Sequence, residues 1–333
     1  MFKVSIIIPI FNVKNYLKRA LDSILNQTMD INDIQVIMVD DKSTDGSDLI
    51  AEEYSNKYDN FSLYKLNQNS GSAAKPRNVG LKYVESEYIM FLDPDDEFLP
   101  TYCEKMYNCI NECDVDLVKC NNIDVTNEGE LFIYYFDKEV HKKLIKNSDQ
   151  PLKYVAIWNG IHKKDFVMKN NIKFPDYFGE DIYFSVKEFL CMDKMIYLND
   201  YFGYRYYSYN ESHAKSPNSN NIRGVINSFV LTKELCKKNN REDVLVIVFG
   251  QQIKSLFSRI YYNNESIKTK VGLLKEMYEF EKDLPKIQID SFILNFTNNL
   301  LLKKLYVLSL IFLKIFFSVY KSKSLYKLLK FLK

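Results

Sequence analysis

Short apolar runs and amphipathic segments alternate over the first 120 residues of the chain. Five runs rich in β-branched and aromatic residues predict strands at 4–8, 35–39, 61–66, 88–92 and 115–120. Apolar residues at helical spacing predict helices between them, at 14–27, 46–58 and 76–85. Because near-continuous apolar runs are typical of strands buried on both faces, the pattern predicts an α/β fold with a mostly parallel sheet flanked by helices.

The pattern changes after residue 120. Residues 121–220 read as loops and aromatic-rich pieces, and helical spacing dominates from about residue 222, with an interruption at Pro285. We therefore predict an α/β domain, a helical region and a basic amphipathic tail. The predicted bounds are 1–220 for the α/β domain, divided into a nucleotide-binding half (1–120) and an acceptor half (121–220), 221–333 for the helical region, and 300–333 for its tail.

Polar clusters follow the first four predicted strands. They read PIFN, DDKSTDGS, NQNSGSAAKPRN and DPDD. The carboxyl ends of parallel strands lie at one edge of a sheet, and ligands bind in the crevice outside that edge. We therefore expect these clusters to build one site.

The cluster after the fourth strand contains Asp93, Asp95 and Asp96. Carboxylates this close repel one another, and a divalent cation that prefers oxygen ligands, Mg²⁺ or Mn²⁺, would offset their charge. The alternative is a polar turn in which Asp96 caps a helix that begins near Pro100 or Thr101. The acidic motif alone does not decide between a metal site and a turn.

The clusters after the second and third strands offer groups for a nucleotide. Asp40 can accept a hydrogen bond from a base or ribose, whereas the Ser-Thr-Asp run at 43–45 reads as helix capping. Gly71 permits close approach of the backbone to a ligand. Lys75 and Arg77 stand at a predicted helix start, where the macrodipole disfavours cations unless an anion binds there. Two solvated cations would cost only about a few tenths of a kcal/mol each, so both interpretations stay open.

The order and spacing of these motifs resemble the family-2 glycosyltransferases of the GT-A fold. The resemblance covers about residues 1–215, and the stretch SGSAAKPRNVGL is similar to enzymes that add N-acetylglucosamine to wall teichoic acid. The matching stretches are VSIIIPIFNVKNYLKRALDSILNQT, VIMVDDKSTDGS, NSGSAAKPRNVGL, YIMFLDPDDEF and WNGIHKKDFVMKNNIKFPDYFGEDIYF.

The resemblance implies a UDP-sugar donor, a Mn²⁺ or Mg²⁺ cofactor and roles for individual residues. The acceptor would be a glycan, a polyol phosphate or a lipid-linked glycan. Residues implied to bind the nucleotide or the sugar are Pro9, Phe11, Asn12, Asp40, Asn67, Gly71, Lys75, Arg77, Asp93 and Arg205. Residues implied to bind the metal are Asp95, Asp93 and His213, although His213 also reads as an ordinary loop histidine. In the GED stretch, Asp181 would be the general base, and Glu180 beside it would support the acceptor or the sugar.

The base assignment also has a chemical reason. Attack of a hydroxyl on an anomeric carbon needs one carboxylate that takes the hydroxyl proton. One base opposite the leaving group predicts inversion, in contrast to the two-step retaining route. The competing interpretation is that Glu180 and Asp181 are acidic residues of a first helical turn, where negative charge is favoured. Trp158 reads either as a platform for the acceptor or as a partly buried core ring.

The charge is distributed unevenly along the chain. The net charge is +2, yet residues 291–333 contain eight lysines and neither Asp nor Glu. On one helix Lys303, Lys314 and Lys321 would form a basic stripe beside apolar residues, as expected of a helix lying on an anionic membrane surface. A packing face for a partner subunit or for the catalytic domain is the alternative. The apolar content of the tail argues against a nucleic-acid-binding arm.

The cysteine spacing, the N-terminal segment and the lack of a GxGxxG motif bear on the cellular compartment and on the class of enzyme. The six cysteines include no CxxC pair, and no charged segment followed by an apolar one opens the chain. We therefore expect reduced thiols in a cytoplasmic protein that acts peripherally at the inner face of the cell membrane. A dinucleotide-dependent oxidoreductase is disfavoured because no GxGxxG follows the first strand. A catalytically idle scaffold that binds sugar nucleotides is the alternative function.

Overall fold

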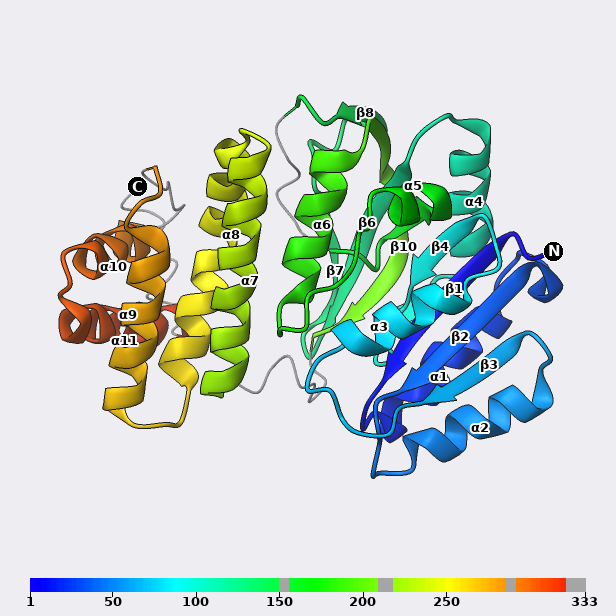
Figure 1. Ribbon diagram of the computed structural model, residues 1–333, viewed down its shortest axis with the longest axis horizontal. Helices are drawn as coiled ribbons and strands as arrows, with labels where there is room; N and C mark the ends of the chain where they lie inside the picture. The colour runs from blue at the N-terminus through cyan, green and yellow to red at the C-terminus, as the bar shows by residue number, and fades with distance from the viewer. Residues whose placement is uncertain (150–155, 209–217, 286–291, 322–333) are drawn as a thin grey trace. The chain divides into compact units, whose positions relative to one another are not determined.

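A single sheet organises the first part of the chain (Figure 1). The computed structural model describes residues 1–149, 156–208, 218–285 and 292–321, and the strands in these ranges run in the order β3-β2-β1-β4-β9-β6-β10-β5, with β7 beside β6 and β8 beside β10. Their bounds are β1 Val4–Ile10, β2 Ile34–Asp40, β3 Phe61–Lys65, β4 Tyr88–Phe91, β5 Glu97–Phe98, β6 Leu117–Thr126, β7 Gly129–Ile133, β8 Lys142–Lys146, β9 Gly160–Lys163 and β10 Lys194–Tyr207.

The strands that lead to the polar clusters are parallel. β1 pairs in parallel with β2 and β4, and β2 pairs in parallel with β3. β6 and β10 are also parallel, while β9 runs antiparallel between β4 and β6. The predicted mostly parallel sheet is therefore confirmed, and the clusters after β1 to β4 meet at one edge.

Helices cover both faces of this sheet. Alternate residues of β1, beginning at Val4, pack in one core with α1, α2 and α4. On the opposite face Phe91 of β4 packs against Phe184 of α6, with 5.7 Å between ring centroids. The helix bounds are α1 Lys14–Leu25, α2 Ser47–Lys57, α3 Ala74–Gly80, α4 Tyr102–Glu112, α5 Lys164–Lys169 and α6 Glu180–Cys191.

Helix α3 lies unusually close to the sheet. It begins at Ala74, two residues before the predicted start at Pro76, and Pro76 sits in the first turn, where no backbone donor is needed. At its other end, a Cβ atom on Gly80 would lie 2.6 Å from Cγ2 of Ile7 in β1. The absence of a side chain at Gly80 therefore allows this approach.

The chain divides into two units. The first comprises Met1–Asp176 and Glu180–Ser212, and the second comprises Tyr177–Gly179 and His213–Lys333. This division falls a little before the predicted domain boundary at residue 220. The assignment of separate nucleotide and acceptor halves stays a prediction.

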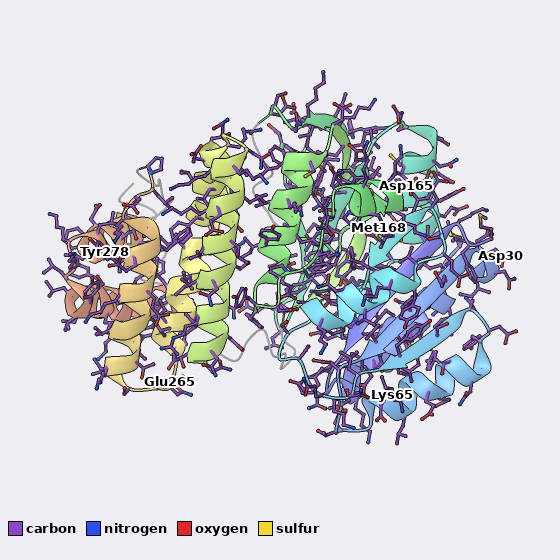
Figure 2. All side chains as sticks on the ribbon, viewed as in Figure 1. Asp30, Lys65, Asp165, Met168, Glu265 and Tyr278 are labelled. Carbon is purple, nitrogen blue, oxygen red and sulfur yellow. The ribbon has the colours of Figure 1, made fainter. Side chains whose placement is uncertain are left out.

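The second unit is helical in its described residues, as the spacing predicts. Its bounds are α7 Ser219–Lys238, α8 Glu242–Tyr262, α9 Ile267–Glu281, α10 Phe292–Leu302 and α11 Tyr306–Lys321. Phe229, Phe249 and Phe280 pack their rings together, with centroids 4.9–5.8 Å apart. Glu265, labelled in Figure 2, lies between α8 and α9 and accepts a hydrogen bond from the amide of Ser219 at the start of α7.

Of the three lysines predicted to form a basic stripe on one helix, only Lys314 and Lys321 lie within α11. Lys303 lies in the turn between α10 and α11, so the expectation that it shares one helix with Lys314 is wrong. The lysines beyond residue 321 lie outside the described residues. In the described part of the chain, the helices are too short or too polar to cross a bilayer.

The buried Glu281 makes the second unit sensitive to pH. The side chain is 3% exposed, and burial raises its pKa to about 7. When the pKa of an acid is higher in the folded state than in the unfolded state, the folded protein loses stability as the pH rises from the unfolded-state pKa to the folded-state pKa. We expect the unit to unfold more readily at pH 8 than at pH 5, by about 3 kcal/mol. Glu281→Gln should remove most of this difference in denaturant titrations, whereas an unchanged pH dependence would contradict the assignment.

Candidate active site

Two buried carboxylates order the loops at the ends of β2 and β3: Asp41 connects the two loops, and Asp40 binds within the loop after β2. Asp41 accepts hydrogen bonds from the amide and the hydroxyl of Ser70, at 3.0 and 2.8 Å, and from Nδ2 of Asn69 at 3.1 Å. Asp40 accepts a bond from the amide of Ser43. Burial raises the pKa of Asp41, and the bonds from Ser70 partly offset this rise. The two loops are therefore fixed to each other at the carboxyl edge of the sheet.

The loop after β1 is held by the loop after β2. Asn12, at φ 50°, donates its amide hydrogen to Oγ of Ser43 and accepts one from the amide of Thr44. Asp45 accepts bonds from Lys14 at the start of α1 and from Ser47 at the start of α2, both at 2.9 Å. One carboxylate thus satisfies backbone donors of two helices, in partial agreement with the predicted capping role.

The predicted nucleotide residues differ in exposure. Pro9 is buried within β1, Phe11 is half-buried, and Asn12 is exposed. Asn67 and Gly71 are both exposed in the loop after β3. The exposed residues lie around the loops that Asp40 and Asp41 fix, so they form an accessible rim at the carboxyl edge.

In the acidic loop, Asp96 has a structural position. It is 1% exposed and accepts hydrogen bonds from the hydroxyl of Tyr204 and the amide of Tyr207, both at 2.8 Å. Burial, with the nearby Asp95 and Asp93, raises the pKa of Asp96 well above its usual range. The alternative that Asp96 caps a helix is wrong, because α4 begins at Tyr102 and Asp96 bonds to β10.

The other two acids of the loop remain partly exposed. Asp93 and Asp95 flank Pro94 in the sequence, and both residues are half-buried. Arg19 of α1 donates a hydrogen bond to the backbone carbonyl of Asp95 and stacks over the ring of Tyr207, 3.5 Å from its centroid. The backbone of the loop is therefore fixed from α1 and from β10, while two of its carboxylates stay accessible.

A buried arginine joins the acidic loop to α6. Arg77 of α3 is 5% exposed and donates to Oδ1 of Asp93 at 2.7 Å and to Oε1 of Glu180 at 2.6 Å. Arg77 is predicted to face a nucleotide or a sugar, but its two terminal nitrogens contact carboxylates of the protein. Arg77 thus aligns three segments that are far apart in sequence.

Glu180 and Asp181 open α6 and have different environments. Glu180 is 7% exposed and paired with Arg77, whereas Asp181 is partly exposed and accepts a bond from the amide of Ile182. Burial and the neighbouring charge of Glu180 raise the pKa of Asp181 to about 7, although Arg77 lowers it. A carboxylate with such a pKa is suited to accept a proton near neutral pH.

Some predicted residues have other partners or lie elsewhere. Arg205 pairs with Glu97 at 2.9 Å and with Glu130 at 3.1 Å, so carboxylates of the protein already balance its charge. Lys75 is exposed. His213 lies outside the described residues. Trp158 stacks on Tyr204, with 4.3 Å between ring centroids, which favours the packing interpretation over a platform for the acceptor.

Sequence reasoning missed three residues that shape the site. Tyr204 binds Asp96, Arg19 binds the carbonyl of Asp95, and Asp41 connects two loops. Asp41 had a usable signal, because it directly follows Asp40 at the end of a buried strand. Arg19 and Tyr204 had no such signal, because the sequence around them indicates neither a ligand nor a partner for their side chains.

Comparison with known proteins identifies the family. The profile described as "Glycosyl transferase family 2" matches residues 5–166. A poly(ribitol-phosphate) beta-N-acetylglucosaminyltransferase, TarP of Staphylococcus aureus, is 33% identical over 271 residues, which cover 80% of this chain and 75% of TarP. The chain belongs to glycosyl transferase family 2. The predicted resemblance to this family and to wall teichoic acid N-acetylglucosaminyltransferases is confirmed.

Other comparisons support the GT-A fold of this family-2 glycosyltransferase. The structure of S. aureus TarS 1-349 in complex with UDP-GlcNAc superimposes with a TM-score of 0.76 at 20% identity, covering 95% of this chain and 92% of that one. Glycosyltransferase GlyA of Streptococcus pneumoniae is 32% identical over 209 residues, or 59% of this chain and 29% of GlyA. The chain spans less than a third of the length of the first curated relatives that it matches.

Proposed function

We propose that this family-2 glycosyltransferase transfers a sugar from a UDP-sugar to a hydroxyl group, with the help of a divalent metal ion and with inversion at the anomeric carbon. The observation that carries this proposal is the difference between the two adjacent acids of α6. Arg77 holds Glu180 in a buried ion pair, which leaves Asp181 as the partly exposed carboxylate with a raised pKa. The arrangement supports one general base and assigns Glu180 a supporting role.

The proposed reaction is a single displacement. The carboxylate of Asp181 takes the proton of the acceptor hydroxyl as its oxygen attacks the anomeric carbon. The bond from that carbon to the diphosphate oxygen breaks, its electron pair leaves with UDP, and the product is a glycoside of inverted configuration. Glu180 is bound to Arg77 at 2.6 Å, so it is poorly placed to act as a covalent nucleophile.

The acidic loop fits a metal ion. Asp93 and Asp95 offer hard oxygen donors on a loop whose backbone is fixed, whereas Asp96 is buried and bonded to β10. The described residues include no group of three potential ligand side chains, so His213, water and the diphosphate would complete the set. Mg²⁺ and Mn²⁺ commonly bind one or two carboxylates together with substrate phosphates. Such an ion would stabilise charge on the departing diphosphate.

Removal of the metal should abolish turnover. We expect EDTA to stop release of UDP and MnCl₂ to restore it, because the leaving diphosphate would lose its counter-charge. Asp95→Asn should weaken Mn²⁺ binding in calorimetry with UDP present. Asp96→Asn is the matched control, since its buried side chain faces β10, and it should keep Mn²⁺ binding. Full turnover in EDTA would disprove metal dependence.

The donor and the acceptor follow from the relatives. The relatives TarP and TarS are poly(ribitol-phosphate) beta-N-acetylglucosaminyltransferases, so we propose UDP-N-acetylglucosamine as the donor and a polyol-phosphate polymer as the acceptor. A panel of UDP-sugars, assayed for UDP release in Mn²⁺ with and without polymer, tests this choice. The alternative, an idle scaffold, would bind UDP-sugars in that panel and release no UDP from any of them.

We further propose that the protein works at the cytoplasmic face of the membrane, with its C-terminal helices in contact with lipid. Four apolar residues of α11 are 42–59% exposed at helical spacing: Val307, Leu308, Ile311 and Ile315. Lys314 is exposed among them, and Lys303 and Lys304 are exposed in the preceding turn. An exposed apolar stripe beside several cations fits an anionic bilayer surface.

Flotation with vesicles tests the membrane contact. The full chain should float with phosphatidylglycerol vesicles and remain unbound with phosphatidylcholine, because the cations contribute about 1 kcal/mol each near an anionic surface. Ile311→Asp/Ile315→Asp should abolish flotation and leave turnover of a soluble acceptor unchanged. Concentration-dependent self-association without flotation would instead assign the stripe to a partner chain.

A further inference from the structure

Three ionisable side chains are buried between α6 and the sheet. Lys119 of β6 is 4% exposed, His162 of β9 is 0% exposed, and Glu188 of α6 is 1% exposed. Nδ1 of His162 lies 2.5 Å from Oε1 of Glu188, and Nζ of Lys119 lies 3.8 Å from Oε2 of Glu188. Lys119 also donates to the carbonyl of Ala156 at 2.7 Å. The proposed displacement uses none of these groups.

Burying such a cluster is costly for the protein. Each ion loses its hydration, and apolar residues of similar volume are often as stable or more stable at such positions. Burial lowers the pKa of Lys119, although Glu188 and Asp181 both act to raise it. A cluster that adds little stability suggests a different use, and one documented use of buried polar groups is to fix the register of packed elements.

The cluster lies on the same helical stripe as the proposed base. Glu188 follows Asp181 by seven residues, which is about two helical turns, or roughly 10 Å along the axis. Residues at this spacing point to the same side of a helix. The electrostatic influence of Asp181 on Lys119 agrees with this placement. The groups around Asp181 are therefore Glu180, Arg77, Asp93 and Lys119.

Helix α6 consequently has two polar anchors. Arg77 holds Glu180 by a hydrogen-bonded ion pair in the first turn, and two turns later Glu188 lies in close contact with His162 and in an ion pair with Lys119, without a geometrically regular hydrogen bond among the described residues. The ring of His162 is itself fixed by Phe91, with 5.5 Å between ring centroids. An apolar helix face can rotate or slide over a sheet with small losses, whereas ion pairs and hydrogen bonds require one geometry. Two anchors restrict both the rotation and the axial position of the helix.

We propose that Lys119, His162 and Glu188 are positioning residues that fix α6 against the sheet and thereby direct the carboxylate of Asp181 toward the acceptor hydroxyl. This inference rests on the proposed role of Asp181 as the base. The cluster acts through α6 and does not touch substrate.

The test replaces the cluster by apolar residues in the full chain. Lys119→Met/His162→Leu/Glu188→Leu should keep the melting temperature, the affinity for UDP and the KM for UDP-N-acetylglucosamine, and should lower kcat by about 10- to 100-fold, since small misplacement of a catalytic group is costly. Lys164→Met is the matched control, because Lys164 likewise donates to a backbone carbonyl, that of Val84, at 2.7 Å. The control should keep kcat.

Two outcomes would overturn the inference. One is a wild-type kcat in the folded triple variant, and the other is a loss of kcat that only parallels losses of melting temperature and UDP affinity. If the triple variant does not fold, Lys119→Met/Glu188→Leu, which removes both charges of the buried pair, is judged by the same criteria. Failure of the proposed function is distinguishable, because turnover would then survive in Asp181→Asn. An inactive Asp181→Asn beside a fully active triple variant rejects the positioning role only.

Discussion

Asp181→Asn should lower kcat by about 100- to 10,000-fold, the range that a general base contributes. The amide cannot take the proton of the acceptor hydroxyl, while Arg77 still holds Glu180 and Asp93 in place. We therefore expect UDP binding, measured by calorimetry, to remain close to that of the wild type. Asp176→Asn is the matched control, because Asp176 is exposed shortly before α6, and it should keep full turnover.

The same residue should set the pH dependence of the reaction. The pKa of Asp181 is raised to about 7, so the base is protonated and inactive below that value, and kcat/KM should fall as pH drops through about 7. The raised pKa also means that ionised Asp181 opposes folding above pH 7, so the Asn variant should melt no lower than the wild type at pH 8. Turnover at the wild-type rate in Asp181→Asn would remove the base assignment.

Arg77→Met should have the largest effect on stability. It leaves two carboxylates, Asp93 and the buried Glu180, without their cation, and breaking a buried ion pair in this way costs about 3–5 kcal/mol. It also detaches the acidic loop from α6, so kcat/KM should fall on the order of 100-fold in the fraction that folds. Urea titration and steady-state UDP release measure the two effects.

The chain contains a suitable control for Arg77. Arg223 pairs with Glu276 at 3.0 Å, but both side chains are about 40% exposed. Arg223→Met should cost less than about 1 kcal/mol, as exposed pairs do. Arg77→Lys should rescue only part of the loss, because an ammonium group cannot hold two carboxylates in a fork. A stability loss in Arg77→Met as small as that in the control would contradict the bridging role.

The sequence predicted the strands and helices of the first 120 residues well because burial sets their pattern, whereas reading 121–220 as loops and aromatic-rich pieces was wrong, since this range contains β7 to β10. The runs at 4–8 and 35–39 are apolar except at Ser5 and Gln35, and both lie in parallel strands that are buried at every position. The spacing of polar clusters after these strands was enough to predict one site at one edge. Local signals also predicted that Glu180 and Asp181 open a helix.

The sequence could not predict how charges pair across long distances. Arg77 is 103 residues from Glu180 in the sequence. No local sequence pattern distinguishes an arginine that forms a buried ion pair with a distant carboxylate from an arginine that binds the phosphate of a ligand. Arg205 poses the same problem, because Glu97 and Glu130 reach it from separate strands. Asp96 resembles its neighbours in sequence, and only the fold of β10 places Tyr204 against it.

The close approach of α3 to β1 at Gly80 limits which residues position 80 can accept. Position 80 is not itself a proposed substrate contact, yet a methyl group there would meet Ile7 at 2.6 Å. Arg77 lies one turn earlier on the same short helix. A methyl group at position 80 would therefore displace α3 from β1 and move the guanidinium of Arg77 away from Asp93 and Glu180. A substitution at this glycine would thus slow glycosylation in addition to disturbing the local packing.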